Sequence, residues 1–543
     1  MTAARAVGSA LAGLGIRRVF GVVGSGNFHV TNALVAAGAR FIAARHEGGA
    51  ATMADAYSRM SGTVAALTVH QGCGLTNAMT GIAEAAKSRT PLLVLAAEVT
   101  EKRSNFYVDQ DALAHSVGAI AMRVEAAQDA VATAARAYHL ARDNRRTVVL
   151  NLPLAVQAAQ AGGPTVSNEP GPPQAEPDAA ELSRLVDALT HAQRPVFVAG
   201  RGSRAPGARE ALLELGEACG ALLATSAVAK GLFHGSPWSL DVSGGFASPL
   251  AAQLLRDADL IVGWGCALNM WTTRHGNLIG PEASVVQVDL EPDALGAHRP
   301  IRFGVVGGVT QTARAATRAI IDAQIGYRSE QIREEIHQRI RWRDVKYDDT
   351  STSERIDPRT LTIALDDMLP TERVIGVDSG NFMGYPSMFL SVPDEYGFCF
   401  TQAFQSIGLG LATAIGAALA QPDRLPIAAL GDGGTLMSIA ELDTVRRLGL
   451  PMVVIVYNDD AYGAEVHHFG PDGVDLSTVR FPPTDIAAIG RGFGFDAVTV
   501  TRVDDLAAVQ TWLDGLRERP LLIDAKVTAD RASWWLEDAF RGH

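Results

Sequence analysis

Residues 430–463 of the chain read LGDGGTLMSIAELDTVRRLGLPMVVIVYNDDAYG, and this stretch decides the fold. An apolar run at residues 426–430 predicts a buried strand, and a second run at residues 452–457 predicts another. Between them, residues 436–448 carry apolar side chains at helical spacing, and Gly449 predicts the end of that helix. A strand–helix–strand unit of this length predicts two neighbouring parallel strands joined by a right-handed crossover.

Polar residues follow both of these strands. Asp432 comes directly after the first and Asn458 ends the second, so both should emerge side by side at the carboxyl edge of the sheet, where open α/β sheets bind ligands. A carboxylate, an amide oxygen and a free loop carbonyl at Asp460 suit a hard cation such as Mg²⁺, which takes its other ligands from water and phosphate. The GDGG turn at residues 431–434 would let backbone N–H groups approach a diphosphate.

A GDG turn followed some two dozen residues later by asparagine resembles the thiamine diphosphate (ThDP) enzymes. Over nearly its whole length the chain resembles their decarboxylase family, which includes pyruvate decarboxylase, benzoylformate decarboxylase and acetolactate synthase. This resemblance implies an α/β fold with three doubly wound parallel-sheet domains, which are pyrimidine-binding, central and diphosphate-binding. It also implies a homodimer or homotetramer, because the family's cofactor lies between the first domain of one subunit and the third domain of another.

The rest of the chain predicts the same organisation. Short apolar runs alternate with helical patterns, which is typical of parallel sheets covered by helices. We expect domains at residues 1–162, 179–326 and 358–529, with a tail at 530–543. The linker at 161–178 is proline-rich, and residues 327–358 are highly charged and predict an exposed helix followed by a crossing segment. The other predicted strands are residues 18–23, 41–44, 64–69, 92–96, 147–152, 195–199, 221–225, 260–264, 284–290 and 374–377.

Composition excludes several classes of protein. A net charge of −12 spread along the 543 residues offers no basic patch for nucleic acid. The four cysteines form no CxxC pair, which argues against a zinc site and against disulfides. The N-terminus has no signal-peptide layout, and no apolar run approaches membrane-spanning length. We therefore expect a cytoplasmic enzyme.

The ThDP cofactor needs a carboxyl group that hydrogen-bonds its pyrimidine ring. Residues 45–50, RHEGGA, match the family's pattern around that group and imply this role for Glu47; the alternative is a helix-start glutamate that favours the dipole. Ile407, between glycines in QSIGLG, would keep the cofactor folded. The segment Asp378-Ser379-Gly380-Asn381 resembles a second diphosphate-binding turn. The resemblance thus assigns cofactor contacts to Glu47, Gly380, Asn381, Ile407, Gly431, Asp432, Gly433, Gly434, Asn458 and Tyr462, and metal ligands to Asp432, Asn458 and Asp460.

The substrate-side residues resemble different members of the family. VHQGCGLTNA at residues 69–78 is similar to benzoylformate decarboxylase, which implies a catalytic His70, and the turn at 24–27 implies that Ser25 holds the substrate carboxylate. Glu465, three residues after Tyr462, is similar to the catalytic glutamate of pyruvate decarboxylases; an exposed helix glutamate is the alternative. A lone His115 replaces the histidine pair of pyruvate decarboxylases. The roles of His115, His467 and His468 stay open.

The combined resemblance implies a ThDP- and Mg²⁺-dependent enzyme that decarboxylates a 2-oxo acid without oxidation and can join the acyl group to an aldehyde. The alternatives are an acetolactate synthase-like carboligase and a ThDP-binding subunit without activity, which the presence of Glu47, Asp432 and Asn458 disfavours. Residues 200–207 lack the third glycine and the later acidic residue of a dinucleotide fingerprint, so we expect no FAD.

Overall fold

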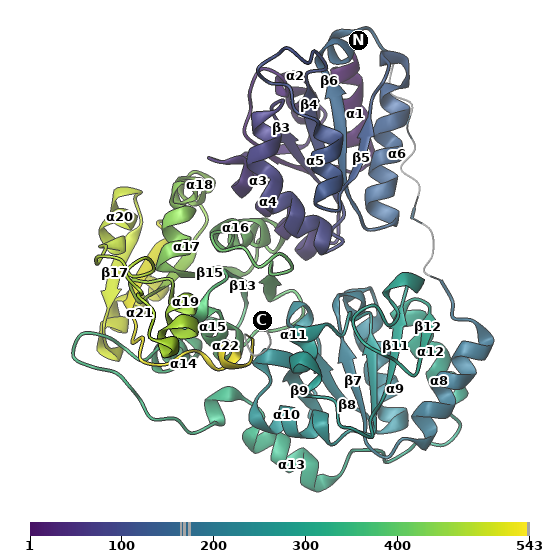
Figure 1. The fold of residues 1–543 in the computed structure, drawn as a ribbon, viewed down its shortest axis with the longest axis vertical. Helices are drawn as coiled ribbons and strands as arrows, with labels where there is room; N and C mark the ends of the chain where they lie inside the picture. Colours follow the sequence, from purple (N-terminus) through teal and green to yellow (C-terminus); the bar gives the residue numbers. More distant parts are fainter. Residues whose placement is uncertain (163–165, 167–169, 172–174, 540–543) are drawn as a thin grey trace.

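A computed structural model describes residues 1–162, 166, 170–171 and 175–539, and its three sheets lie in three separate lobes (Figure 1). Each sheet has six strands, and every pairing between named strands is parallel. The three doubly wound domains are therefore confirmed. The domain limits themselves stay predictions. Part of the linker, residues 163–165, 167–169 and 172–174, lies outside the described residues, as do residues 540–543 of the tail.

The first sheet has the strand order β2-β1-β3-β4-β6-β5, with the fully buried strands β3 and β4 at its centre. Their continuous apolar runs explain why they are buried on both faces. The strands are β1 (Arg18–Gly21), β2 (Arg40–Ala43), β3 (Ala65–Val69), β4 (Leu92–Glu98), β5 (Ile120–Arg123) and β6 (Thr147–Pro153), and the helices are α1 (Ala3–Leu14), α2 (Phe28–Ala36), α3 (Glu47–Ser61), α4 (Cys73–Lys87), α5 (Gln110–Ser116), α6 (Ala130–Asp143) and α7 (Leu154–Ala158).

The second sheet has the order β12-β11-β10-β7-β8-β9, and its edge strands β9 and β12 show alternating burial. Its strands are β7 (Pro195–Ala199), β8 (Leu222–Thr225), β9 (Ser239–Val242), β10 (Leu260–Trp264), β11 (Ser284–Asp289) and β12 (Phe303–Val306). Its helices are α8 (Ala179–His191), α9 (Ala208–Cys219), α10 (Pro249–Arg256), α11 (Met270–Thr273) and α12 (Val309–Ala319), and α13 (Glu330–Arg339) is the expected charged helix.

The third sheet has the order β14-β13-β15-β16-β18-β17. Its strands are β13 (Arg373–Val377), β14 (Phe398–Phe400), β15 (Leu425–Gly431), β16 (Val453–Asn458), β17 (Asp496–Val500) and β18 (Leu521–Lys526). Its helices are α14 (Pro358–Met368), α15 (Gly384–Phe389), α16 (Gly410–Ala420), α17 (Asp432–Met437), α18 (Leu442–Leu448), α19 (Gly463–Phe469), α20 (Ile486–Gly492), α21 (Ala507–Asp514) and the C-terminal α22 (Trp534–Ala539).

The crossover between β15 and β16 differs from its prediction. The expected single helix at residues 436–448 is wrong, because α17 already begins at Asp432 and ends before Ser438, and α18 follows a short 3₁₀ turn. The Ser438 hydroxyl donates to the Gly434 carbonyl at 2.9 Å, a local bond that competes with regular helix geometry. Gly449 does end α18, in the left-handed conformation expected of a helix C-terminus (φ 64°).

The first and third domains share one apolar core. A single cluster of buried side chains includes Met53 of α3 and Leu411 and Ile415 of α16. The two helices approach closely at Gly416, where an added Cβ would lie 2.3 Å from the Met53 carbonyl oxygen. Their mutual placement is therefore fixed by packing that larger residues would disrupt. In the described part of the chain, no helix combines the length and apolarity needed to cross a membrane.

Candidate active site

Asp432 and Asn458 lie next to each other at the carboxyl edge of the third sheet, as strand order predicted. Gly431 pairs with Tyr457 in the register of β15 and β16, so the residues that follow them leave the sheet together. Asp432 is the first residue of α17 and is only 8% exposed. Asn458 is fully buried. The GDGG turn thus presents a mostly enclosed carboxyl group beside an amide.

Acidic side chains are crowded at this edge. Burial raises the pKa of Asp432 to about 6, and the negative charge of Asp460 contributes to the shift. Burial and the charge of Asp432 raise the pKa of Asp459 to about 7. Carboxylates that repel one another in a low-dielectric site are neutralised by protons or by a cation. The electrostatics of this edge therefore favour cation binding.

Asp460 makes contacts with both its carboxylate and its backbone carbonyl that its sequence position did not predict. Its carboxylate pairs with the Arg355 guanidinium at 2.6 Å, and its backbone carbonyl accepts a hydrogen bond from the Phe481 N–H at 2.8 Å. The expectation of a free loop carbonyl is wrong, because the segment that ends at Phe481 runs along this loop. A carbonyl oxygen has a second lone pair, so Asp460 stays a predicted metal ligand.

A buried aspartate orients the Asn458 amide. Asn458 Nδ2 donates to Asp524 Oδ1 at 2.8 Å, and Lys526 Nζ lies 3.2 Å from the other Asp524 oxygen. With Nδ2 engaged, Asn458 Oδ1 faces the loop and accepts the Asp460 N–H at 3.2 Å. The expected site residues do not include Asp524, although an acidic residue within the apolar strand LLIDAK signals a buried polar contact.

The residues at this edge fit Mg²⁺ bound together with a diphosphate. Within residues 1–162, 166, 170–171 and 175–539, no three or more His, Cys, Asp or Glu side chains gather in a way that could hold a metal ion. The site would instead combine one carboxylate with amide and carbonyl oxygens. That set suits Mg²⁺, which needs few protein ligands when phosphate and water supply the others.

The turn glycines have a packing reason of their own. A Cβ on Gly433 would lie 2.6 Å from the Tyr462 ring, and a Cβ on Gly434 would lie 2.1 Å from Asp378 Oδ2. Both distances are far below van der Waals contact, so only glycine allows Tyr462 and Asp378 to approach the turn. Gly431 is nearly as close to the Phe382 ring, at 3.1 Å for its added Cβ. Contact of these glycines with a diphosphate stays a prediction.

Asp378 connects the second predicted turn to the segment that carries Ile407. Asp378 Oδ2 accepts the Gly408 N–H at 2.9 Å and Oδ1 accepts the Leu409 N–H at 3.2 Å. Burial outweighs these bonds and raises the pKa of Asp378 to about 6. The Asn381 side chain, by contrast, accepts the Ser533 N–H at 2.9 Å and so faces the C-terminal segment. The Asn381 carbonyl likewise accepts hydrogen bonds from Ser533 and Trp535, so the contacts of Gly380 and Asn381 with the cofactor stay predictions.

The first-domain residues gather at the carboxyl edge of their own sheet. His70 follows β3, and its Nδ1 accepts the Gly26 N–H at 3.3 Å, next to the exposed Ser25. Burial lowers the pKa of His70, against the nearby charge of Glu47. A neutral imidazole whose Nδ1 accepts a hydrogen bond carries its proton on Nε2. His70 is therefore held with an N–H available for donation.

Glu47 is fixed by contacts that sequence reasoning did not identify. It opens α3, and its Oε2 accepts the Asn77 amide N–H at 3.1 Å. One residue earlier, the His46 N–H donates to Glu441 of the third domain at 3.0 Å, as does the Arg45 N–H. Asn77 lies in the segment TNA that follows His70, where the sequence predicts a helix, so sequence analysis could have found it. Glu441 becomes recognisable as a partner only once the domains are packed.

The other titratable candidates lie in α19 and α5. Glu465 is half-buried in the first turn of α19. That helix directly follows the loop at residues 458–462, here called the metal loop because it carries the predicted metal ligands Asn458 and Asp460. His467 is also half-buried, its Nε2 lacks a hydrogen-bond partner, and burial lowers the pKa of its imidazole. The His468 ring packs edge-on against Phe469. His115 is exposed in α5, so it does not line an enclosed site within one chain.

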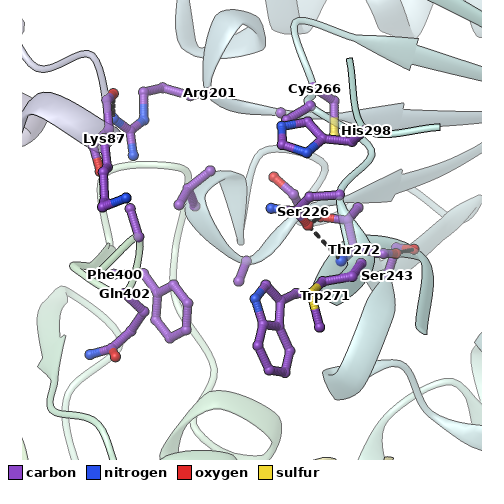
Figure 2. Close-up of a pocket in the computed structure, with 18 of the residues that line it drawn as sticks. Lys87, Arg201, Ser226, Ser243, Cys266, Trp271, Thr272, His298, Phe400 and Gln402 are labelled. Carbon is purple, nitrogen blue, oxygen red and sulfur yellow. Dashed lines mark hydrogen bonds between the residues drawn. The ribbon is translucent and has the colours of Figure 1, made fainter. Parts of the chain in front are cut away.

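The two groups of residues are not bonded to each other within the described part of one chain. No hydrogen bond or ion pair in the described part of the chain joins Glu47, His70 or Ser25 to Asp432, Asn458 or Glu465. A cavity of about 400 Å³ lies elsewhere, where the three domains join, and none of these six residues lines it. Figure 2 shows Arg201 beside Lys87 on one side of this cavity and Trp271 with Cys266 on the other.

Three family models match the chain. They are described as the thiamine pyrophosphate enzyme N-terminal TPP binding domain, central domain and C-terminal TPP binding domain, and they match residues 1–122, 182–316 and 378–525 respectively. The matches include every predicted site residue, whereas β6 and β13 lie outside the matched ranges.

Three relatives are similar over nearly the full chain. A sulfoacetaldehyde acetyltransferase of Rhodobacter capsulatus is 28% identical over 97% of this chain and 94% of its own. A probable 2-ketoarginine decarboxylase of Pseudomonas aeruginosa is 29% identical over 91% of this chain and 88% of its own. The acetolactate synthase isozyme 2 large subunit of Escherichia coli is 26% identical over 98% of this chain and 97% of its own.

We predict that Asp432→Ala lowers the affinity for Mg²⁺ and ThDP by at least about 100-fold, since it removes the carboxylate predicted to bind the cation. The fold should survive this substitution. The pKa of Asp432 in the folded chain is raised to about 6, so above that pH its ionised carboxylate destabilises the folded state, and its removal does not lower stability through charge. For the same reason Mg²⁺ affinity of the parent should rise as the pH increases through about 6 to 7. Isothermal titration at several pH values measures both effects.

The matched control is Asp472→Ala, which removes the same charge at an exposed position of the same domain. It should leave the affinity and its pH dependence unchanged. Equal affinities of Asp432→Ala and the parent would contradict the metal assignment.

Proposed function

Because the chain belongs to the thiamine pyrophosphate enzyme family, we propose that it is a ThDP- and Mg²⁺-dependent enzyme that decarboxylates a 2-oxo acid without oxidation. When bound, ThDP supplies the electron sink that makes loss of CO₂ possible. The observation that carries the proposal is the pair of titratable groups at the two sheet edges: a neutral His70 that carries a proton on Nε2, and a half-buried Glu465 beside the metal loop.

Glu47 would contact the pyrimidine ring of the cofactor. Its Oε2 is occupied by Asn77, which leaves Oε1 for a second hydrogen bond. An added Cβ on Gly74 would lie 3.5 Å from that Oε1, at ordinary van der Waals contact, so Gly74 lies directly beside the carboxylate. The Glu441 contacts to the backbone at 45–46 hold the start of α3 and therefore the direction of the Glu47 side chain.

His70 and Glu465 would deliver and remove protons. An aldehyde product requires a proton at the carbon that lost CO₂, and its release requires removal of a proton from oxygen. His70 can donate from Nε2, and a half-buried carboxylate such as Glu465 can accept and return a proton. Ser25, exposed one residue before Gly26, would bind the substrate carboxylate through its hydroxyl.

A carboligase is the second candidate, and the names of the relatives favour it. Both a sulfoacetaldehyde acetyltransferase and an acetolactate synthase transfer an acyl group, whereas the 2-ketoarginine relative is a decarboxylase. The two candidates share loss of CO₂ and differ in whether a proton or a second carbonyl compound meets the acyl group. Residues that supply the proton therefore decide between them.

We further propose that the complete site forms between two copies of the chain. Each half of the site is bordered by apolar side chains that are 37% to 62% exposed, which is unusual for surfaces that stay in water. These are Val23, Phe28 and Phe106 in the first domain and Leu436, Met437, Tyr462, Phe469 and Phe481 in the third. A second copy that covers them would also bring Glu47 and His70 toward Asp432 and Glu465.

We predict that Glu465→Gln and His70→Ala each slow aldehyde release by about 10²–10⁴-fold, the usual effect of losing a general acid or base. ThDP affinity should be unchanged, because neither residue is assigned to the cofactor. In Glu465→Gln the ratio of ligated product to free aldehyde should rise, measured against CO₂ evolved from a panel of 2-oxo acids with acceptor aldehydes. Aldehyde release at the parent rate would make Glu465 an ordinary helix residue.

We predict that mixing Glu47→Gln with Asp432→Ala restores function. In a shared site, a mixed dimer has one site with both substitutions and one site with neither, so random exchange of subunits should return roughly a quarter of the parent signal. The signal is exchange of the ThDP C2 proton for deuterium, which needs no substrate. Each variant alone is the control, and a mixture no better than its components would place the whole site within one chain.

We predict that the purified protein is colourless. The turn at 200–202 follows β7, but its glycines allow close contact with the segment that follows β10: an added Cβ on Gly202 would lie 2.8 Å from the Gly265 Cα. A glycine committed to such packing is weak evidence for dinucleotide binding. An absorption spectrum with a flavin band in stoichiometric amount would contradict this prediction and favour the carboligase.

A further inference from the structure

The segment that carries Ile407 is held at both ends by buried carboxylates from different domains. Downstream, Asp378 accepts the Gly408 and Leu409 N–H groups. Upstream, Glu84 of α4 accepts the Ala403 N–H at 3.1 Å and the Phe404 N–H at 2.6 Å. Asp378 belongs to the third domain, as does the segment itself, whereas Glu84 reaches it from the first.

The residues between these anchors have little other support. Ala403, Phe404 and Gln405 are exposed, and Gln405 has a φ of 57°, a left-handed conformation that costs energy in a residue other than glycine. Such a backbone persists only when its surroundings impose it. The two N–H bonds to Glu84 immediately precede Gln405 and are suited to impose that conformation.

Glu84 is itself held in a fully buried polar cluster. The Arg59 guanidinium lies 2.8 Å from Glu84 Oε1 and also pairs bidentately with Asp55, four residues earlier on α3. The Ser88 hydroxyl donates to the same Glu84 oxygen at 3.1 Å. Burial would raise the pKa of Glu84, but the Arg59 charge and the Phe404 and Ala403 N–H groups outweigh it and lower that pKa. The acceptor is therefore a carboxylate at neutral pH.

The Ile407 turn also abuts the GDGG turn. An added Cβ on Gly408 would lie 3.1 Å from Met437 Cβ, and an added Cβ on Gly434 would lie 3.3 Å from Gly408 N. A displacement of the segment at 403–405 would therefore move Ile407 relative to the groups around Asp432, because the Ile407 turn and the GDGG turn are already in close contact.

We propose that Glu84 is a positioning residue, which fixes from the first domain the backbone at 403–404 and thereby the place of Ile407 beside the GDGG turn. This inference rests on the proposed function only for what Ile407 contacts, namely the ThDP cofactor. The two hydrogen bonds from the Ala403 and Phe404 N–H groups to Glu84 are a property of the chain without cofactor.

The test compares Glu84→Gln with Asp55→Asn in the full-length protein. Both substitutions replace a buried carboxyl group beside Arg59 with an amide, but only Glu84 contacts the segment at 403–404. An amide in place of the carboxylate presents one N–H₂ group to N–H donors, so it cannot keep both bonds. Glu84→Asp keeps the charge but shortens the reach, and it is the variant to use if Glu84→Gln does not fold.

Backbone amide exchange without cofactor is the first measurement. In the peptide that covers residues 401–410, exchange should be about 10-fold faster in the Glu84 variants than in the parent, the effect of losing about one hydrogen bond. Asp55→Asn should stay within about twofold of the parent. Equal exchange in the Glu84 and Asp55 variants would overturn the proposal, whether or not the protein binds ThDP.

Exchange of the C2 proton in bound ThDP is the second measurement. It should slow by about 10-fold or more in Glu84→Gln while ThDP affinity changes by less than about threefold, because the residue acts on alignment and not on binding. Adding Ile407→Ala should bring little further loss, as expected for two residues that act through one contact. Normal C2 exchange despite faster amide exchange would reject the positioning role. A parent protein that fails to bind ThDP would refute the proposed function. The amide exchange result would then decide by itself whether Glu84 holds the backbone at 403–404.

Discussion

The buried Arg59 guanidinium joins the first domain to the third, and the central domain contacts the same cluster. From α3 it pairs with Asp55 and Glu84, and it donates to the Phe400 carbonyl of the third domain at 2.9 Å. Arg201 of the central domain donates to the Ser88 carbonyl beside this cluster, and burial next to Arg59 lowers the pKa of Arg201 to about 9. A buried charge that lost its partners would be costly, so the domains can be joined in few other ways.

This junction separates the two sets of candidate catalytic residues. The shared core of α3 and α16 orients the first and third sheets so that their carboxyl edges carry His70 and Glu47 on one side and Asp432 and Asn458 on the other. Each set has its own supporting contacts within the chain, from Asn77 and Asp524 respectively. What each set lacks is a cover over its exposed apolar border, which a second copy of the chain would supply.

The motif residues have structural and chemical roles at the same time. Gly433 and Gly434 allow Tyr462 and Asp378 to approach the metal turn, while Asp378 also caps the segment of Ile407. The raised pKa values of Asp432 and Asp459 show that this arrangement gathers acidic groups at an energetic cost. Binding of a cation would relieve that cost, in keeping with the proposed metal site.

The sequence alone determined the three α/β domains, the interior strands other than β18, and the meeting of Asp432 with Asn458, because continuous apolar runs and strand order are local properties. It missed β18, whose apolar run is interrupted by the acidic Asp524. It did not predict the edge strands β5, β9, β12, β14 and β17, whose burial is partial or whose runs are short, since one side of an edge strand has no neighbour. It also placed one helix where α17 and α18 are separate. The roles of Glu84, Glu441 and Asp524 were decided only by tertiary structure, because their partners lie far away in sequence and burial alone makes those contacts specific.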